Sequence, residues 1–261
     1  MLRALRSAAA GMRAQQLYLD TTAHNLANVN TTGFKRNRVG FEDLLYQTIE
    51  PATGAAGNGR SAPLQVGHGS RPSDTTKIFT QGDSEVTSNP LDVLIEGDGF
   101  LQVQRIDGTT GYTRDGSLTV DEQGRLVTHQ GFVVQPEITV PSDASSIAIT
   151  ADGRILVEQA GQVGANEIGQ ILLARFPNAA GLVAEGSNVF RDAGVSGDPQ
   201  VGVPGENGLG SITQGALERS NVQVVEEMVN MILAQRAFEV SSKAVKAADD
   251  MMGIAANIRP A

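Results

Sequence analysis

Cysteine and tryptophan are both absent from the 261 residues of this chain, and aromatic residues make up only 4% of it. Without cysteine the protein has neither disulfide bonds nor thiolate metal sites. No run of 18 apolar residues is present, so the sequence predicts no transmembrane helix. The apolar stretch from Ala8 to Met12 is too short for a cleavable secretion signal. Glycine, in contrast, is frequent at 30 residues, which suits turn-rich β-structure with modest cores.

Positive charge is scarce in the middle of the chain. Residues 1–40 carry six basic side chains against one acidic side chain, whereas residues 41–216 carry nine basic and 22 acidic ones, within a net charge of -9. An acidic body repels the phosphates of nucleic acids. We therefore expect no nucleic-acid partner.

The residue patterns of common active sites are missing as well. There is no Gly-x-Ser-x-Gly motif, no Gly-Lys phosphate loop and no His-Glu-x-x-His metal helix. The three histidines, His24, His68 and His129, fall in different predicted elements. The neighbouring acids Glu226–Glu227 and Asp249–Asp250 point about 100° apart on a helix. The sequence therefore predicts no catalytic, cofactor-binding or metal site.

The stretch from Leu217 to Asn257 predicts one long helix, because no proline interrupts it and an apolar residue recurs at every seventh position. Three residues after each of these comes a small or polar residue, so the apolar stripe is narrow. A narrow stripe indicates packing against another helix, although ordinary core packing can give the same spacing. The series consists of Leu217, Val224, Met231, Phe238, Val245 and Met252.

A matching pattern at the other end of the chain favours a helix partner. Residues spaced alternately by three and four form a heptad series over nearly four heptads. We expect this helix to run from about Leu2 to Val29 and to end where Asn28, Asn30 and Gly33 accumulate. The two seams predict terminal helices paired as a coiled coil, with the intervening chain inserted between them. The first seam consists of Leu2, Leu5, Ala9, Met12, Gln16, Leu19, Ala23 and Leu26.

From Asp92 onwards the apolar period changes to two, which predicts β-strands. The Gly97–Gly99 turn should pair strands at 93–95 and 101–103, and turns at 121–124 and 152–153 should each pair two more. A buried strand is expected over 171–176. Turns every 8 to 12 residues indicate an antiparallel sandwich or barrel-like domain. The predicted fold class is therefore α+β.

The segment between the first helix and these strands predicts a connector. The chain from Pro51 to Ser73 is rich in Gly, Pro, Ala and Ser and reads as a long loop, after a short amphipathic turn within Val39–Leu45. The predicted domains are a discontinuous helical coiled-coil domain of residues 1–35 and 215–261, an extended connector of residues 36–90, and a β-rich domain of residues 91–214.

Several stretches together resemble the rod and hook proteins of the bacterial flagellum, in the family's order and over nearly the whole chain. The first lies between Asn25 and Lys35, and its signature residues are Asn25, Asn28, Asn30, Thr31, Gly33 and Phe34. The others are Asn89–Asp92 with Ile95–Phe100, Tyr112–Gly116 with Gly124–Thr128, and Gly215–Val222 with Gln235–Glu239.

The resemblance implies a structural subunit of the distal rod of the basal body, because the chain length and Gln65–Arg71 ahead of Phe79–Gly82 are most similar to that part of the family. In the family, the terminal helices form the inner wall of a hollow, rigid tube that transmits motor torque to the hook. The β-domain lies outside, and the loop between them is thought to keep the rod straight. The seam residues would then pack subunits together.

The same resemblance implies the partners and the location. The partners are further copies of the chain, the proximal rod proteins, the hook protein, the P- and L-ring proteins, the rod cap protein and the flagellar type III export apparatus, with no small-molecule substrate. The location is the rod in the periplasm, reached by type III export without a cleaved signal. Phe41 and Leu45 match the Phe-x-x-x-apolar export signal of the family, although plain helix packing would also explain them.

Two other classes of function remain open at this point. The basic helix from Arg3 to Arg13 is compatible with a peripheral membrane or surface-binding module that lies on anionic lipid. An enzyme with a site that the sequence does not reveal is the third possibility.

Overall fold

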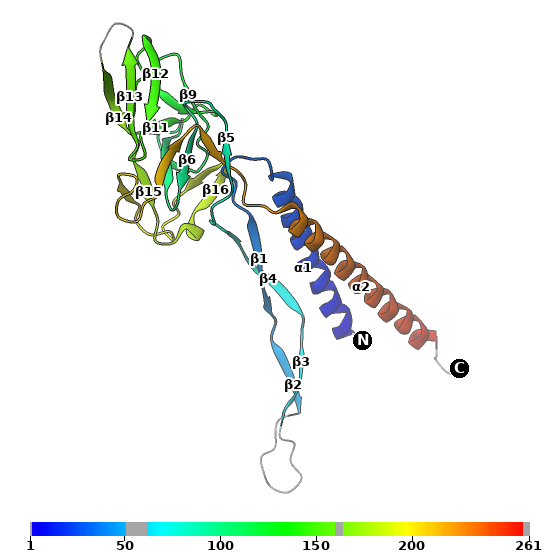
Figure 1. Ribbon diagram of the computed structural model, residues 1–261. Coiled ribbons are helices and arrows are strands. Elements are labelled where there is room, and N and C mark those ends of the chain that lie inside the picture. Colours follow the sequence, from blue (N-terminus) through cyan, green and yellow to red (C-terminus); the bar gives the residue numbers. More distant parts are fainter. Residues whose placement is uncertain (1, 51–61, 160–163, 258–261) are drawn as a thin grey trace. The chain divides into compact units, whose positions relative to one another are not determined.

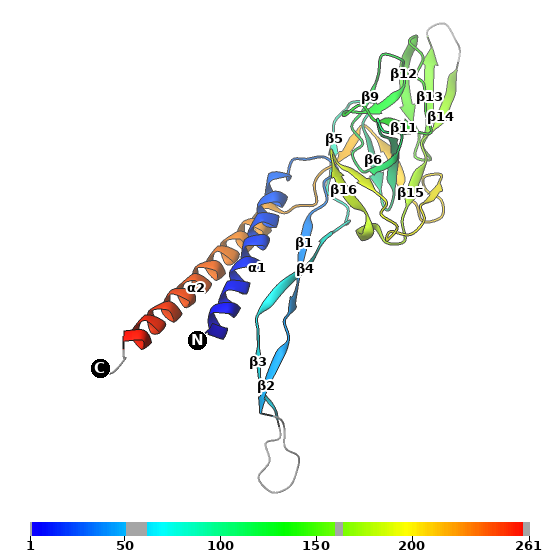
Figure 2. The same ribbon diagram turned by 180° about the vertical axis from the view of Figure 1, so that it is seen from behind.

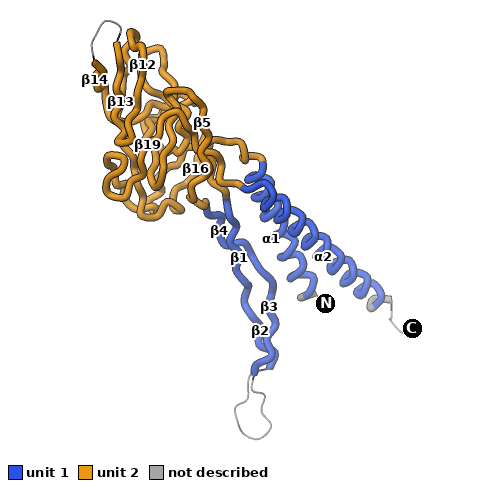
Figure 3. The backbone as a smooth tube through the Cα atoms, in the orientation of Figure 1, with its two compact units in different colours: residues 1–26, 37–76, 223–261 blue, residues 27–36, 77–222 orange. Residues whose placement is uncertain are grey.

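The chain forms two compact units in the computed structural model, which describes residues 2–50, 62–159 and 164–257. Unit 1 comprises residues 1–26, 37–76 and 223–261, and unit 2 comprises residues 27–36 and 77–222 (Figure 3). The chain therefore crosses from one unit to the other four times.

Unit 1 contains the two terminal helices, α1 (Leu2–Ala27) and α2 (Val224–Asn257). They lie side by side, with the start of α1 and the end of α2 at the same end (Figures 1 and 2). They approach closely at Gly11, where an added Cβ would lie 3.7 Å from Ser241 Oγ. No helix among the described residues is long and apolar enough to cross a membrane.

The predicted start of the C-terminal helix at Leu217 is wrong. Leu217 lies in strand β20 (Ala216–Glu218), opposite Glu85 of β5 (Ser84–Val86), and α2 begins seven residues later. The heptad spacing continues through this strand, but the backbone groups of residues 216–218 are committed to the ladder with β5. The seam on α2 is therefore limited to Val224, Met231, Phe238, Val245 and Met252.

Unit 1 also contains a β-ribbon where the sequence predicted a turn and a loop. Its strands are β1 (Asn37–Asp43), β2 (Tyr46–Glu50), β3 (Leu64–Gly67) and β4 (Ser70–Lys77), with β1 paired to β4 and β2 to β3. Residues 51–61 of the expected loop lie outside the described residues. The strand at 70–77 is polar and contains Pro72, so its sequence lacks the alternation of apolar residues that would predict a strand. A two-stranded ladder tolerates this proline because one edge of each strand is unpaired.

Unit 2 is built from open antiparallel sheets, not from a closed barrel or sandwich. Its largest sheet has nine strands, ordered β16-β17-β8-β7-β11-β10-β9, with β15 paired to β7 and β18 paired to β15. A three-stranded sheet, β12-β13-β14, and the pairs β19-β6 and β20-β5 complete the unit (Figure 1). The remaining elements are β6 (Val93–Glu96), β7 (Phe100–Gln104), β8 (Thr110–Thr113), β9 (Leu118–Val120), β10 (Leu126–Thr128), β11 (Val133–Gln135), β12 (Ala144–Ile149), β13 (Arg154–Gln159), β14 (Ala165–Gln170), β15 (Leu173–Arg175), the 3₁₀ turn η1 (Ala179–Gly181), β16 (Val183–Gly186), β17 (Val189–Arg191), β18 (Gln200–Gly202) and β19 (Ser211–Gln214).

Two of the three predicted hairpins are confirmed. Strands β9 and β10 pair with Leu126 opposite Val120, and β12 and β13 pair with Ile149 opposite Ile155. The hairpin predicted around Gly97–Gly99 is wrong, because β6 pairs with β19 and not with β7. The carbonyl groups of Gly97, Asp98 and Gly99 accept hydrogen bonds from Arg114 and Gly210, so this turn connects two sheets.

Two clusters of buried side chains lie within unit 2. The larger is aliphatic and includes Leu101, Val103, Leu118 and Leu173, each essentially without solvent exposure. The smaller is aromatic and joins Phe100, Tyr112, Phe176 and Phe190, with Phe79 packed against it. The inward-facing residues of the predicted strands thus form one aliphatic core, and the few aromatic residues gather beside it.

Candidate functional site

A buried carboxylate in unit 2 brings together distant parts of the sequence. Glu218 is 2% exposed and lies between two buried cations, Lys35 and Arg114. Lys35 Nζ lies 2.5 Å from Glu218 Oε1, and Arg114 Nη1 lies 3.2 Å from Glu218 Oε2. The backbone N–H of Gly82 also donates to Glu218 Oε1 at 2.8 Å. Both carboxylate oxygens are therefore satisfied inside the protein.

The two cations complete the cluster through backbone carbonyl groups. Lys35 Nζ donates to Thr80 O at 2.7 Å, and Arg114 donates to Gly97 O and Gly99 O. Burial lowers the pKa of Lys35 from 10.5 to about 8, although the Glu218 carboxylate opposes this and Arg114 adds to it. Desolvation of the ammonium group thus outweighs its ion pair, as is common for buried pairs.

The backbone of the first signature stretch lies directly against this cluster. Gly33 has a φ of +65°, and an added Cβ would lie 2.7 Å from the carbonyl carbon of Arg114, so this position needs glycine. The Gly33 N–H donates to Glu218 O at 2.7 Å. Thr32 Oγ1 donates to Asp115 Oδ1 at 2.9 Å. The signature residues therefore serve close packing between chain segments.

Among the predicted signature residues, Asn25 has a separate role within unit 1. Its side chain donates to Asn37 O at 2.9 Å and accepts from Asn37 N at 2.8 Å, which ties the last turn of α1 to the start of β1. Asn28 accepts from the Thr31 hydroxyl and from the Thr31 N–H in the turn that follows α1. Phe34 is buried, and the ammonium group of Lys77 lies 5.2 Å from its ring centroid.

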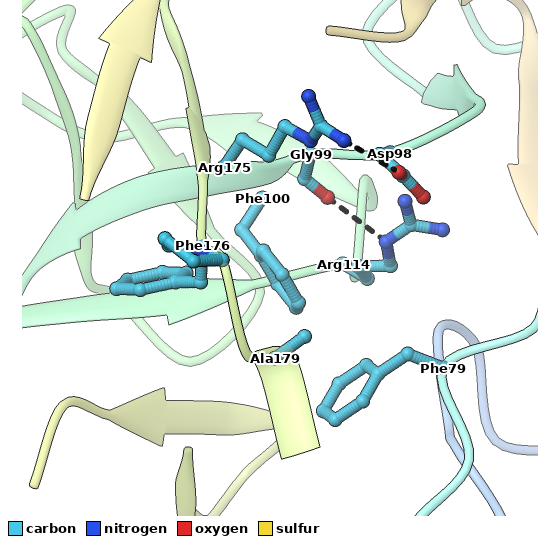
Figure 4. Close-up of a pocket in the computed structure, with 9 residues that line it drawn as sticks. Phe79, Asp98, Gly99, Phe100, Arg114, Arg175, Phe176 and Ala179 are labelled. Carbon is cyan, nitrogen blue, oxygen red and sulfur yellow. Dashed lines mark hydrogen bonds and ion pairs between the residues drawn. The ribbon is translucent and has the colours of Figure 1, made fainter. Parts of the chain in front are cut away.

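A pocket of about 240 Å³ lies beside Arg114 (Figure 4). Phe79, Phe100 and Phe176 supply an apolar wall. Asp98 and Arg175 lie 3.7 Å apart and form an ion pair at it. The lining residues include no serine, histidine or lysine, and no group of three or more potential metal ligands occurs in the described parts of the chain. The pocket thus combines an apolar wall with an exposed ion pair and the buried Arg114.

Helix α2 has apolar side chains on two opposite faces. One face is buried and contains Glu227, Ala234 and Ala248, each at most 4% exposed. Residues nine apart lie two and a half turns apart, and so point in opposite directions. Val225 is therefore opposite Ala234, yet it is 75% exposed. The exposed side, which we call the outer face of α2, carries the apolar residues Val225, Val229, Ile232, Val240, Met251 and Ile254, between 48% and 75% exposed, and the exposed charged residues Arg236, Lys243 and Asp250 lie on the same side.

The predicted seam residues of α2 lie mainly at the edges of its buried face. Met231, Val245 and Met252 are half-buried, whereas Val224 and Phe238 are 41% and 36% exposed. The small or polar residues three positions later are the better buried members. The role of the seam residues in subunit packing stays a prediction.

The predicted seam of α1 agrees less well with burial. Leu5, Ala9, Met12, Leu19 and Leu26 are half-buried and Gln16 and Ala23 are exposed, while the side chain of Leu2 is outside the described set. The buried residues are Ala14, Thr22 and Asn25. The β-ribbon explains the shift, because Tyr18 contacts Phe41 with ring centroids 6.2 Å apart and an added Cβ at Gly69 would lie 3.2 Å from Ala10 Cβ. With neighbours on two sides, α1 buries more than one heptad seam, and regular coiled-coil pairing is not confirmed.

The candidate export residues are both accessible. Phe41 is 43% exposed on β1, where the sequence predicted a helical turn, and Leu45 is 87% exposed between β1 and β2. Phe41 packs against Tyr18 of α1, so helix packing stays an alternative explanation for this residue.

Sequence reasoning missed Lys35, Arg114 and Glu218. All three stand inside the stretches that carry the family resemblance, namely Asn25–Lys35, Tyr112–Gly116 and Gly215–Val222. Only their convergence identifies them, because Lys35 and Glu218 are separated by 183 positions.

Loss of the central carboxylate should destabilise unit 2 more than loss of one cation. Glu218→Gln leaves Lys35 and Arg114 buried without a counter-charge, and we expect it to cost about 3 to 5 kcal/mol. Lys35→Met leaves Glu218 paired with Arg114 and should cost about 1 to 2 kcal/mol. Urea unfolding followed by circular dichroism measures both. Equal losses, or a Glu218→Gln variant as stable as the wild type, would contradict the central role of Glu218.

The lowered pKa of Lys35 predicts a pH dependence. The folded protein releases this proton near pH 8, whereas the unfolded chain holds it until about pH 10.5. Between these values the unfolded state binds more protons, so the free energy of unfolding should rise with pH across this window. The matched comparison is Lys35→Met, whose unfolding profile should lack this rise. Parallel profiles for the two proteins between pH 8 and pH 10.5 would contradict the shift.

Comparison with protein-family models gives three matches along the chain. Residues 5–35 match the flagella basal body rod protein family, residues 94–157 the flagellar hook protein FlgE/F/G D1 domain, and residues 213–258 the flagellar basal body rod FlgEFG protein C-terminal region. Lys35, Arg114 and Glu218 each fall in a different one of these matches. The ion-pair cluster therefore joins the three segments that match the family models.

Curated relatives match over almost the whole length. The flagellar basal-body rod protein FlgG of Borreliella burgdorferi is 49% identical over 99% of this chain and 99% of its own length. The FlgG proteins of Buchnera aphidicola subsp. Acyrthosiphon pisum and Caulobacter vibrioides are 45% and 42% identical, over 97% and 99% of this chain and 98% and 100% of their own lengths. With the family segments brought together at one buried site and identity at this level from end to end, the chain belongs to the FlgG family of flagellar basal-body rod proteins.

Proposed function

We propose that this protein is the repeating subunit of the distal rod, a hollow and rigid drive shaft that carries motor torque to the hook. The observation that carries the proposal is the outer face of α2. Helix α2 carries apolar side chains on two opposite sides, and one of these sides is exposed in the single chain. Exposed apolar patches commonly mark interaction sites. Further copies of the chain are the partner that would cover this side.

The arithmetic of burial supports assembly through this face. Each half-exposed Val, Ile or Met side chain should contribute about 1 kcal/mol when a neighbour covers it. The β-ribbon exposes further apolar side chains: Leu45, Tyr46, Ile49 and Leu64 are each at least 45% exposed. A patch that binds a different patch on the next copy generates an open helical tube. Unit 1 thus offers two unlike apolar surfaces from which such a contact can be made.

Charge supports the same arrangement. Unit 1 contains ten basic and ten acidic residues, whereas unit 2 contains ten basic and 19 acidic ones. Neutral surfaces associate without the self-repulsion that a high net charge would impose. We therefore assign subunit packing to unit 1, through the outer face of α2 together with the seam residues Leu2, Leu5, Ala9, Met12, Leu19, Ala23 and Leu26 on α1 and Val224, Met231, Phe238, Val245 and Met252 on α2.

The proposal includes the chain's working divisions and its surroundings. Residues 1–35 and 215–261 would serve as the packing domain, residues 36–90 as the connecting ribbon and residues 91–214 as the outer domain. The subunit would reach the periplasm by type III export, with the exposed pair Phe41 and Leu45 as its signal. It would adjoin the proximal rod, hook, ring and cap proteins. We propose no catalytic activity, and no observation favours the membrane-surface alternative.

Charges placed on the outer face of α2 should block assembly without unfolding the monomer. Ile232 and Val240 are 55% and 66% exposed, so Ile232→Glu combined with Val240→Glu should change the free energy of unfolding by less than about 1 kcal/mol. Two unpaired negative charges would then be buried in each subunit contact, and rods should be absent. The measurements are circular dichroism of the purified monomer, electron microscopy of isolated basal bodies, and swimming in soft agar.

The matched control is Gln235→Glu, an exposed and already polar position beside the apolar residues of the outer face, which should leave rods and swimming intact. Normal rods from the double variant would rule out this face as a subunit contact.

A further inference from the structure

Three segments of unit 2 carry the four chain crossings between the units. The first connector, residues 27–36, follows α1 and precedes β1; the second, residues 77–82, follows the ribbon; the third, residues 216–222, precedes α2. All three connectors lie in unit 2. Hydrogen bonds among the three connectors therefore determine whether the crossings move independently or as one element.

Asn221 of the third connector binds both other connectors. Its side-chain oxygen accepts from Arg36 N at 2.8 Å, in the first connector. Its side-chain nitrogen donates to Ile78 O at 2.8 Å, to Thr80 O at 3.1 Å and to Thr80 Oγ1 at 3.0 Å, in the second. One amide group thus uses both its donor and its acceptor atoms to join three segments.

Glu218, three residues before Asn221, also connects all three segments. Its carbonyl oxygen accepts from Gly33 N in the first connector, and its carboxylate binds Lys35 in the first and Gly82 N in the second. Ile78 N donates to Arg36 O at 2.9 Å, which links the first and second connectors directly. Every pair of connectors is therefore joined by at least one hydrogen bond.

We propose that Glu218 and Asn221 form a clamp that makes the four crossings carry force as one element. This rests on the proposed function, in which torque must pass between the packed helices and the outer domain of each subunit. A single crossing can rotate about its φ and ψ angles. If force reached the hydrogen bonds between the connectors one at a time, they would break one at a time. Bonds loaded side by side must break together.

The clamp accounts for a costly feature of the site. Burying charged groups is expensive, and apolar residues of similar size often stabilise a fold better. Charged and amide groups, however, fix distances and directions, which apolar contacts do not. Asn221 is the residue that tests this role, because it lies outside the ion pairs and its loss leaves no buried charge unpaired.

The first experiment measures amide hydrogen exchange in the purified monomer by NMR. In Asn221→Ala the amide of Arg36 loses its acceptor, and its exchange should accelerate about tenfold, the effect of one hydrogen bond. The amide of Val127, in the core of unit 2, should be unchanged. The control is Asn166→Ala, an exposed asparagine on β14. Unchanged exchange at Arg36 would overturn the clamp, whether or not the protein forms rods.

The second experiment measures the strength of rods from cells that express each variant. Purified basal bodies are sheared under fixed conditions, and breaks within the distal rod are counted by electron microscopy. Asn221→Ala should assemble and then break more often than wild type. Val127→Ala, which weakens the buried core away from the connectors, should break at the wild-type frequency. Equal breakage in both variants would reduce Asn221 to an ordinary stabilising residue and overturn the proposal.

A more conservative variant covers the case in which Asn221→Ala does not fold. Asn221→Asp keeps the acceptor for Arg36 N but loses the donor to Ile78 and Thr80. Its Arg36 amide should stay protected while its rods still break more often, because the second connector is released. Wild-type breakage of these rods would contradict a clamp that needs all three connectors. Absence of any distal rod in cells whose only distal rod gene encodes the unmutated chain would instead contradict the proposed function.

Discussion

The carboxylate of Glu218 is the group on which the rest of unit 2 depends. It balances two buried cations and accepts a backbone N–H, and its own backbone holds Gly33. Without it, two positive charges would share a site that excludes water, which would make the free energy of folding much less favourable. The open sheets of unit 2 have no barrel closure to hold their ends together. A polar centre that satisfies every partner provides that constraint instead.

The terminal helices differ from this polar centre, because α2 has apolar side chains that are exposed in the single chain. Helix α2 buries Ala234 and Ala248 on one side and exposes Val225 and Ile232 on the other. Helices gain most of their stability from packing of an apolar face and not from intrinsic propensity. The proposed assembly would cover the exposed side of α2, whereas the excess of acidic residues lies in unit 2.

Sequence patterns identified those elements whose signals are local. The heptad series located both helices, and the turns at 121–124 and 152–153 located two hairpins, because each depends on residues close along the chain. The patterns failed where pairing is distant. Strand β6 pairs with β19, more than a hundred residues later, and the polar strand β4 is formed by its partner β1. Lys35, Arg114 and Glu218 look like surface charges until the fold brings them together. The predicted start of α2 was wrong for a related reason. Leu217 keeps the heptad spacing, but it pairs with Glu85 of β5 in a strand ladder.

The most direct test of the account is hydrogen exchange measured by mass spectrometry on the dilute monomer and again on assembled rods. Because unit 1 lacks its neighbours in the monomer, residues 2–26 and 224–257 should exchange rapidly there, while β7, β10 and β15 of unit 2 stay protected. In rods the two helices should become as protected as unit 2. Helices that are already as protected in the monomer as the strands of unit 2 would contradict the claim that unit 1 is completed only by assembly.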